Sequence, residues 1–275
     1  MISLPESFNF KRTWGPTPKY DRVLAYSKPS TFKVIAGPCS VESKEQIHTI
    51  AKFVASQGAT HLRGGVFRAG TYPSKNFGYV DELLLHQYQF AARVNGLKNI
   101  IEILDYSDDA LKNVLSYADC VQVGCRQMQN YTLLKILAKT GKPIFLKRHP
   151  GSTMDEFLGS AEHILATNEH CDLTLIERGS SNHLSHVRWD LSISIIPAIK
   201  LLTKIPIICD ASHGTGRRDL VQPMALAGVA AGADGVLLET HTDPDNSLSD
   251  KEQAISFDVF SETISKINKI RGVLS

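Results

Sequence analysis

Eight short runs rich in aliphatic and β-branched residues alternate with longer stretches whose apolar residues recur at helical spacing. Within each run the apolar residues are nearly continuous, which is typical of parallel strands buried on both faces. The expected strands are FKVIAG (32–37), HLRGGVF (61–67), NIIEIL (99–104), CVQVG (120–124), PIFLK (143–147), LTLIE (173–177), PIICD (206–210) and GVLLE (235–239). The expected helices cover 43–57, 80–95, 107–116, 130–140, 153–166, 188–203, 219–231 and 251–272.

Eight strand–helix units predict an α/β fold, a (β/α)8 TIM barrel. A doubly wound open sheet is the alternative. Residues 1–30 contain four prolines and little periodicity, so we expect an N-terminal arm there and the barrel over 31–275. The alternative for 1–30 is a tail that packs on nothing. At the start of the helix expected at 153–166, Ser152 and Thr153 precede Asp155 and Glu156, whose charges suit a helix N-terminus.

Charge and composition exclude several classes of protein. Thirty Lys and Arg against 28 Asp and Glu give a net charge of +2, so no basic field points to nucleic acid. No apolar run approaches the ~18 residues of a membrane helix, and the N-terminus lacks the apolar core of a signal peptide. The five cysteines are odd in number and scattered, which predicts no disulfide framework and a cytoplasmic location.

Cationic residues stand at or after the ends of several expected strands. In a TIM barrel the C-terminal ends of the strands and the loops after them form one mouth, where active sites lie. Clustered cations repel one another unless an anion is bound, and Arg recognises phosphate and carboxylate with two donors at once. We therefore expect a small anionic substrate; the alternative is that each cation is a surface or salt-bridged residue. The cations are Arg63, Arg68, Arg126, Lys147 and Arg178.

A second set at the same ends combines a thiol, an imidazole and two carboxylates, namely Cys39, His213, Glu239 and Asp250. Such a mixed set suits Mn, Fe, Co or Zn, whereas the thiolate disfavours Mg. The alternatives are a buried apolar role for Cys39 and a loop or capping role for His213. We expect His241, which follows Glu239 closely, to be exposed; the alternative is that it supports the metal ligands from behind.

Several stretches resemble the 3-deoxy-7-phosphoheptulonate (DAHP) synthases of the type I beta subgroup. The last of them also resembles the 3-deoxy-octulosonate 8-phosphate (KDO8P) synthases. The stretches are AGPCSVES (36–43), LRGG (62–65), QVGCRQMQN (122–130), FLKR (145–148), ERG (177–179), DASHGTGRRDLV (210–221) and AAGADGVLLETHTDPDNSLSDKEQ (230–253).

The resemblance implies a barrel enzyme that joins phosphoenolpyruvate to an aldehyde and releases phosphate. It implies that the thiol, imidazole and carboxylates above bind a divalent metal, with Cys39 and His213 catalytic. It also implies phosphoenolpyruvate contacts from Arg63, Arg126, Lys147 and Arg178. We add Lys147 to the catalytic residues, and Lys147 or Glu102 as the group that moves the proton of an attacking water. The family is oligomeric, so we expect a homodimer or homotetramer.

The chain departs from the family after the second expected strand. The DAHP synthases carry Lys-Pro-Arg-Thr there, and the aligned residues are Arg68-Ala69-Gly70-Thr71. Arg68 keeps a cation and Thr71 is retained, so both are predicted to bind substrate, but Gly70 replaces an Arg that helps hold the aldehyde substrate. SSNHLSHVRWD (180–190) also departs from the subgroup's text.

Three functions follow from this resemblance. The first is DAHP synthesis from phosphoenolpyruvate and erythrose 4-phosphate, the first step of aromatic biosynthesis. The second is the same condensation with a different aldehyde, and the third is a non-catalytic regulatory barrel that binds phosphoenolpyruvate.

Overall fold

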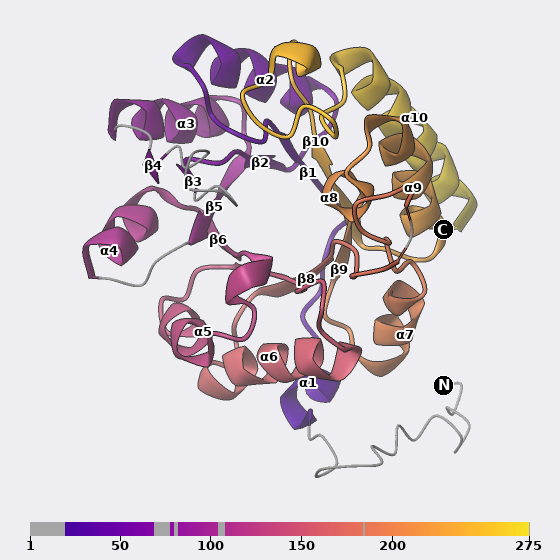
Figure 1. Ribbon diagram of the computed structural model, residues 1–275. Coiled ribbons are helices and arrows are strands. Elements are labelled where there is room, and N and C mark those ends of the chain that lie inside the picture. Colours follow the sequence, from indigo (N-terminus) through magenta and orange to yellow (C-terminus); the bar gives the residue numbers. More distant parts are fainter. Residues whose placement is uncertain (1–19, 69–77, 80–81, 104–107, 184, 275) are drawn as a thin grey trace.

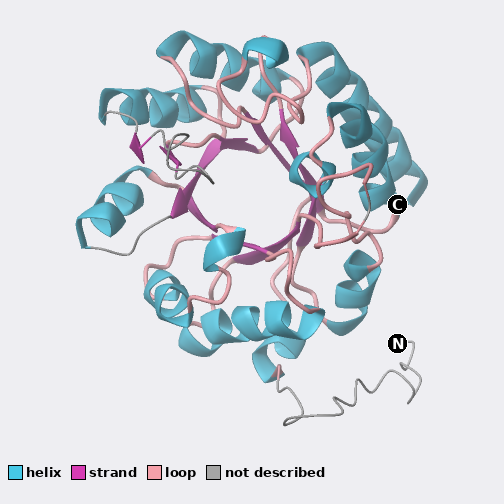
Figure 2. Ribbon diagram, viewed as in Figure 1, coloured by secondary structure: helices cyan, strands magenta, loops and turns pink. Residues whose placement is uncertain are grey.

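A closed ring of eight parallel strands, surrounded by helices, forms the centre of the molecule (Figure 2). The computed structural model describes residues 20–68, 78–79, 82–103, 108–183 and 185–274. Around the ring the strands follow the order β1-β10-β9-β8-β7-β6-β5-β2. They are β1 (Lys33–Gly37), β2 (His61–Arg63), β5 (Lys98–Ile103), β6 (Cys120–Val123), β7 (Ile144–Lys147), β8 (Leu173–Glu177), β9 (Ile207–Asp210) and β10 (Gly235–Glu239). The predicted TIM barrel is confirmed and the open sheet is wrong.

Helices follow the barrel strands around the outside, with shorter elements at the mouth (Figure 1). The α-helices are α1 (Asp21–Ala25), α2 (Lys44–Ser56), α3 (Glu82–Val94), α4 (Asp108–Tyr117), α5 (Tyr131–Ala138), α6 (Met154–Thr167), α7 (Ile195–Leu202), α8 (Ala211–Thr215), α9 (Arg218–Ala230) and α10 (Phe257–Leu274). Two 3-10 turns are η3 (Cys125–Gln127) and η4 (Pro244–Asn246), and β3 (Phe67–Arg68) pairs antiparallel with β4 (Gly78–Tyr79). No helix in the described ranges is both long and apolar enough to cross a bilayer.

Local sequence accounts for the N-terminal end of α6. Thr153 caps α6 in a capping box: its side chain accepts from the Glu156 N–H, while the Glu156 carboxylate accepts from the Thr153 N–H.

Within the predicted arm, α1 packs on α6, where Arg22 and Glu162 form an ion pair at 3.2 Å. The Tyr26 hydroxyl donates to the carbonyl oxygen of Leu173 at the start of β8.

The predicted strand over 61–67 was too long. The barrel strand β2 ends at Arg63, and the chain then turns where a Cβ at Gly64 would lie 2.7 Å from Val41 Cγ2. Arg68 therefore lies in the small sheet and not at the end of a barrel strand. Two predicted helices were also too long at their N-terminal ends: α7 begins at Ile195 instead of 188, and α10 begins at Phe257 instead of 251.

The barrel interior has two chemically different layers. The lower one, here the apolar layer, takes one buried side chain from each of seven strands: Ile35, Ile100, Cys120, Phe145, Ile176, Ile208 and Leu237. Side chains two residues apart on a strand share a face, so the next inward positions lie one step nearer the mouth. Those positions are polar on seven of the eight strands, namely Arg63, Glu102, Gln122, Lys147, Arg178, Asp210 and Glu239. The fold thus places a charged layer directly on an apolar one.

Candidate active site

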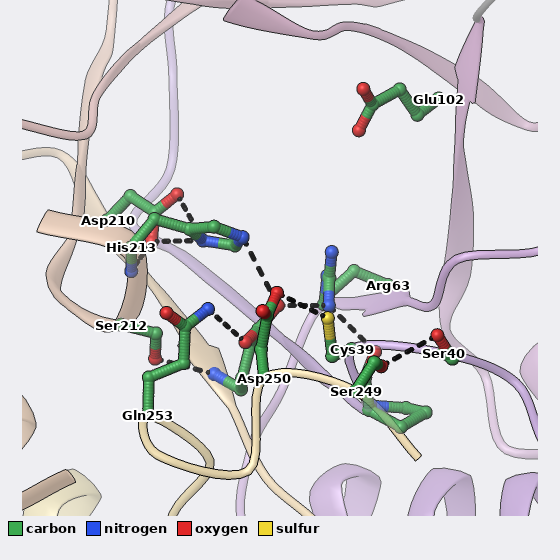
Figure 3. A network of polar contacts seen from close by, with 12 residues as sticks. Cys39, Ser40, Arg63, Glu102, Asp210, Ser212, His213, Ser249, Asp250 and Gln253 are labelled. Carbon is green, nitrogen blue, oxygen red and sulfur yellow. Dashed lines mark hydrogen bonds and ion pairs between the residues drawn. The ribbon is translucent and has the colours of Figure 1, made fainter. Parts of the chain in front are cut away.

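Three of the four predicted metal ligands lie together at the mouth. Figure 3 shows two of them, Cys39 and Asp250, side by side. Cys39 follows β1, Glu239 ends β10, and Asp250 comes from the loop after β10. Their possible ligand atoms all lie within 4.8 Å of one another, and Cys39 Sγ is 3.1 Å from Asp250 Oδ2. One thiol and two carboxylates at this spacing fit a divalent cation such as Mn²⁺, Fe²⁺ or Zn²⁺.

The fourth predicted ligand, His213, lies beside this group on α8. Its Nε2 is 3.3 Å from Glu239 Oε1, and its Nδ1 is 3.0 Å from Asp210 Oδ1. Asp210 also caps α8 by accepting from the His213 backbone N–H. An imidazole that donates from Nδ1 to a carboxylate keeps Nε2 as a lone-pair donor, which is the arrangement seen in metal-binding histidines.

Asp210 connects the predicted metal ligands to the predicted anion site, and sequence reasoning gave it no role. The Lys147 ammonium lies 3.0 Å from its Oδ2, an oxygen that is also 2.9 Å from His213 Nδ1. Burial alone would raise the pKa of Asp210, but its contacts with His213 and Lys147 hold this pKa well below its usual range. Its inward position, two residues beyond Ile208 of the apolar layer, was the signal that could have identified it.

Arg63 approaches the metal group from β2. Its Nη1 donates to Glu239 Oε1 and to the Pro38 carbonyl oxygen, both at 2.7 Å. Gln253 Nε2 donates to the other Glu239 oxygen at 2.6 Å. Burial opposes ionisation of Glu239, yet its contacts with His213 and Arg63 keep its pKa below the ordinary value. Glu239 is thus an ionised carboxylate inside the protein, as a metal ligand must be.

Two buried arginines carry donors that no acceptor in the described part of the chain takes up. These donors are Nε of Arg63 and both Nε and Nη1 of Arg178. Arg178 follows β8, is 6% exposed, and has its pKa lowered by burial. An unsatisfied buried donor costs free energy, so such groups mark a place where a ligand or water supplies the acceptor.

The structure describes the side chains of only some of the other residues predicted to bind substrate. Lys147 is buried beside Asp210, whereas Arg126 lies exposed on η3 after β6. For Arg68 the structure gives the backbone in β3, and its side chain lies outside the described part, as do Gly70 and Thr71. Glu102 accepts from Gln122 Nε2 at 2.7 Å and lies apart from the Cys39 group in Figure 3.

The loop that carries Asp250 is tied to the loop after β1. Asp250 has φ 47°, a left-handed conformation that is uncommon outside glycine. Glu42 Oε1 accepts from the Leu248 N–H at 2.9 Å, and the Ser40 and Ser249 hydroxyls are 2.7 Å apart. His241 is 5% exposed and lies 3.3 Å from Glu42 Oε2, so the prediction that it is exposed was wrong. Its partner comes from a distant part of the sequence, which no local pattern reveals.

Comparison with known proteins gives one consistent answer. Residues 24–273 match the model of the DAHP synthetase I family. A phospho-2-dehydro-3-deoxyheptonate aldolase of Thermotoga maritima is 38% identical over 243 residues, covering 88% of this chain and 71% of that protein. A 2-dehydro-3-deoxyphosphooctonate aldolase of Desulfotalea psychrophila is 26% identical over 274 residues, covering 88% of this chain and 90% of that protein.

The solved structures agree with the sequence relatives. The crystal structure of the Thermotoga maritima DAHP synthase has a TM-score of 0.83 at 37% identity, covering 89% of this chain and 70% of that one. A truncated form of the 3-deoxy-D-arabino-heptulosonate 7-phosphate synthase from the same organism gives 0.80 at 37% identity, covering 89% and 88%. The family resemblance expected from the motifs is therefore confirmed, and the chain belongs to the DAHP synthetase I family.

Proposed function

We propose that this enzyme condenses phosphoenolpyruvate with erythrose 4-phosphate, giving DAHP and inorganic phosphate with the help of a divalent metal. Family membership supports the condensation of phosphoenolpyruvate with an aldehyde. The name of the Thermotoga maritima relative supports the seven-carbon product over the eight-carbon one, because that relative is 38% identical and the phosphooctonate aldolase 26%.

The observation that carries the proposal is the set of three buried arginine donors without a protein acceptor in the described residues, on Arg63 and Arg178. Phosphoenolpyruvate brings a carboxylate and a phosphate, which are the acceptors that guanidinium groups bind best. In a buried site such charge-assisted bonds are stronger than in water and can also stabilise charge that develops during reaction.

The donor set of Cys39, His213, Glu239 and Asp250 fits a divalent metal, because it offers a thiol and two carboxylates within 4.8 Å of one another and an oriented imidazole beside Glu239. When bound there, a metal of this kind supplies Lewis acidity toward an aldehyde oxygen. The chain's own contribution is to hold the ligands: Asp210 orients His213, and Gln253 and Arg63 fix the two oxygens of Glu239.

The reaction balances as phosphoenolpyruvate, aldehyde and water in, and the lengthened keto acid and phosphate out. Carbon 3 of phosphoenolpyruvate forms the new bond to the aldehyde carbon, water adds at carbon 2, and the C–O bond to phosphate breaks. Arg63, Arg178 and Lys147 hold the anionic groups. Of the two predicted proton carriers, the Glu102 carboxylate can take up a proton of the water, whereas the Lys147 ammonium can only give one up; both stand at inward positions of the charged layer.

A different aldehyde is the second candidate, favoured by Gly70, which stands where the family has an Arg for the aldehyde substrate. Losing one charge-assisted contact costs about 1.5–3 kcal/mol, or roughly one to two orders of magnitude in affinity. Because that loss is smaller than the sum of the retained contacts, erythrose 4-phosphate remains the first choice.

The test measures phosphate release from phosphoenolpyruvate with Mn²⁺ and erythrose 4-phosphate, beside a panel of phosphorylated and unphosphorylated aldehydes. Turnover confined to erythrose 4-phosphate supports the first candidate, and faster turnover on another aldehyde supports the second. Phosphoenolpyruvate binding without turnover on any aldehyde would replace both with the regulatory barrel. A folded Cys39→Ala variant that keeps full turnover after chelation would remove the metal from the proposal.

We also propose a homodimer or homotetramer located in the cytoplasm. All five cysteines are free, which suits a reducing compartment. Light scattering of the purified chain gives the oligomeric state directly, and a monomeric mass would contradict this part of the proposal.

A further inference from the structure

The indole ring of Trp189 lies against the buried guanidinium of Arg178, two of whose donors have no partner among the described residues. Arg178 Cζ is 5.0 Å from the centroid of the Trp189 ring. Trp189 is half-buried, whereas Arg178 is 6% exposed. Burial increases the strength of a cation–π contact, because less water competes for the cation.

Backbone contacts fix the position of Trp189. Ser180 and Asp190 exchange two backbone hydrogen bonds of 2.8 and 3.0 Å, which close the loop 180–190 at its base, next to Trp189. The Arg188 N–H donates to the Thr215 carbonyl oxygen at 2.9 Å, which ties the same end of the loop to the segment after β9. The ring therefore belongs to an anchored part of the loop.

Gly179 makes the close approach possible. Its φ is 95°, and a Cβ there would lie 2.8 Å from Trp189 Cβ and 3.0 Å from the Gly214 carbonyl oxygen. Only glycine accommodates both this conformation and this packing. The strand end that carries Arg178 and the loop end that carries Trp189 are thus packed directly on each other.

The contact with the Trp189 ring can orient the Arg178 guanidinium. Neither Nε nor Nη1 of Arg178 has a hydrogen-bond partner among the residues that the structure describes. The guanidinium is planar, so a contact through its face to an aromatic ring leaves the donors in its plane available to an anion. The Asp210 carboxylate and the Cys125 side chain are among its neighbours, which places this cation in the mouth described above.

We propose that Trp189 is a positioning residue for phosphoenolpyruvate: its ring holds the Arg178 guanidinium so that Nε and Nη1 face the substrate's carboxylate or phosphate. This inference rests on the proposed function. Trp189 lies in the segment 180–190, where the sequence departs from the family's usual text, so the inference concerns a feature of this chain.

The first experiment compares Trp189→Leu, which keeps much of the apolar volume, with Trp189→Phe, which keeps an aromatic face. Phe90→Leu is the matched control, because Phe90 is an exposed ring on α3 with Arg93 Cζ 5.9 Å from its centroid. We expect Trp189→Leu to raise the Kd of phosphoenolpyruvate by calorimetry, and its KM, by roughly tenfold, with kcat within about threefold of wild type. Trp189→Phe and Phe90→Leu should stay within about threefold of the wild-type Kd.

Two outcomes would overturn the inference. One is a Trp189→Leu variant with wild-type Kd, and the other is a Trp189→Phe variant as impaired as Trp189→Leu, because the ring face would then not matter. Failure of the proposed function is distinguishable: in that case wild type itself neither binds nor consumes phosphoenolpyruvate.

A second experiment begins with the site itself unchanged. The chain has two tryptophans, Trp14 and Trp189, so Trp14→Phe leaves one reporter next to Arg178. Titration with phosphoenolpyruvate should change its emission with the Kd that calorimetry gives, and adding Arg178→Lys should weaken both signals together. Unchanged emission at calorimetric saturation would show that the anion does not reach the Arg178–Trp189 pair, and the inference would fail.

Discussion

Asp210 is the residue on which the two halves of the site depend. Its carboxylate lies between the Lys147 ammonium and the His213 imidazole, at 3.0 and 2.9 Å, and is fully buried. A buried carboxylate is stable only with such partners, and each partner is in turn oriented by it. The geometry of the metal group and of the anion site therefore changes if this single charge is lost.

Asp210→Asn should lower Mn²⁺ affinity roughly 10- to 100-fold, because an amide no longer fixes His213 as a carboxylate does. Isothermal titration with Mn²⁺ measures this affinity. Asp219→Asn is the matched control, since Asp219 pairs with Arg217 on the surface and exposed pairs contribute little. Equal Mn²⁺ affinity in both variants would show that Asp210 does not position the ligand.

His61 makes stability depend on pH away from the site. It is buried near Phe145 of the apolar layer, and burial lowers its pKa from 6.5 to about 4. Between these values the unfolded chain binds a proton that the folded chain does not, so stability decreases as pH falls from 6.5 toward 4. The loss from this one group is on the order of 3 kcal/mol over that range.

Urea unfolding of wild type and His61→Gln at a series of pH values checks this. The free energy of unfolding of wild type should drop more steeply below pH 6.5 than that of the variant. Parallel curves for the two proteins would mean that His61 is protonated equally in both states.

Some single residues could be predicted and others could not. Cys39, Glu239 and Asp250 were predicted from their residue types at expected strand ends, and they do lie together. Asp210 received no role because its importance comes from two neighbours on other elements. The burial of His241 was missed for the same reason, since its partners Glu42 and Gln46 lie about 200 residues earlier.

At the scale of elements, two loops from opposite ends of the sequence share one set of hydrogen bonds. The loop after β10 carries Asp250. Hydrogen bonds from this loop to Glu42, Ser40 and Gln46, in the segment after β1, hold it in place. Asp250 pays a conformational cost for its positive φ, on the order of 1 kcal/mol or more, so these bonds must hold it there.

Glu42→Ala should therefore weaken Mn²⁺ binding roughly tenfold, as expected when a group that supports a ligand is removed. Saturating Mn²⁺ should restore most of kcat, because Glu42 touches no substrate in this proposal. Glu45→Ala, on the exposed first turn of α2, serves as the control. A Mn²⁺ titration that does not distinguish Glu42→Ala from Glu45→Ala would contradict this role of the loop.

The elements themselves were predicted best where local signals were strong. The start of α6 followed from Ser152 and Thr153 ahead of the acidic Asp155 and Glu156; the capping box between Thr153 and Glu156 is a further detail that the structure adds. The late start of α7 could not be predicted, because residues 180–190 are held as a loop by pairing of Ser180 with Asp190 and by contact with Thr215. Such long-range pairing has no periodic signature.

At the scale of the whole molecule, charges of both signs gather at the mouth of a barrel whose chain has a net charge of only +2. The charged layer at the mouth includes Arg63, Lys147 and Arg178, and two of these have donors without described protein acceptors. Inorganic phosphate should therefore compete with phosphoenolpyruvate for the same cations. Calorimetric titration at rising phosphate concentration should raise the apparent Kd in proportion, and a Kd independent of phosphate would place the two anions at different sites.

The apolar layer limits how ligands can enter and leave the barrel. Its seven side chains, each at most 2% exposed, fill the interior below the charged residues. The barrel is therefore a well and not a tube, with a single way in and out. Whatever lies against Arg63 and Lys147 at the bottom must enter before a partner that binds above it, and it stays enclosed until that partner, or the product made from both, has moved away.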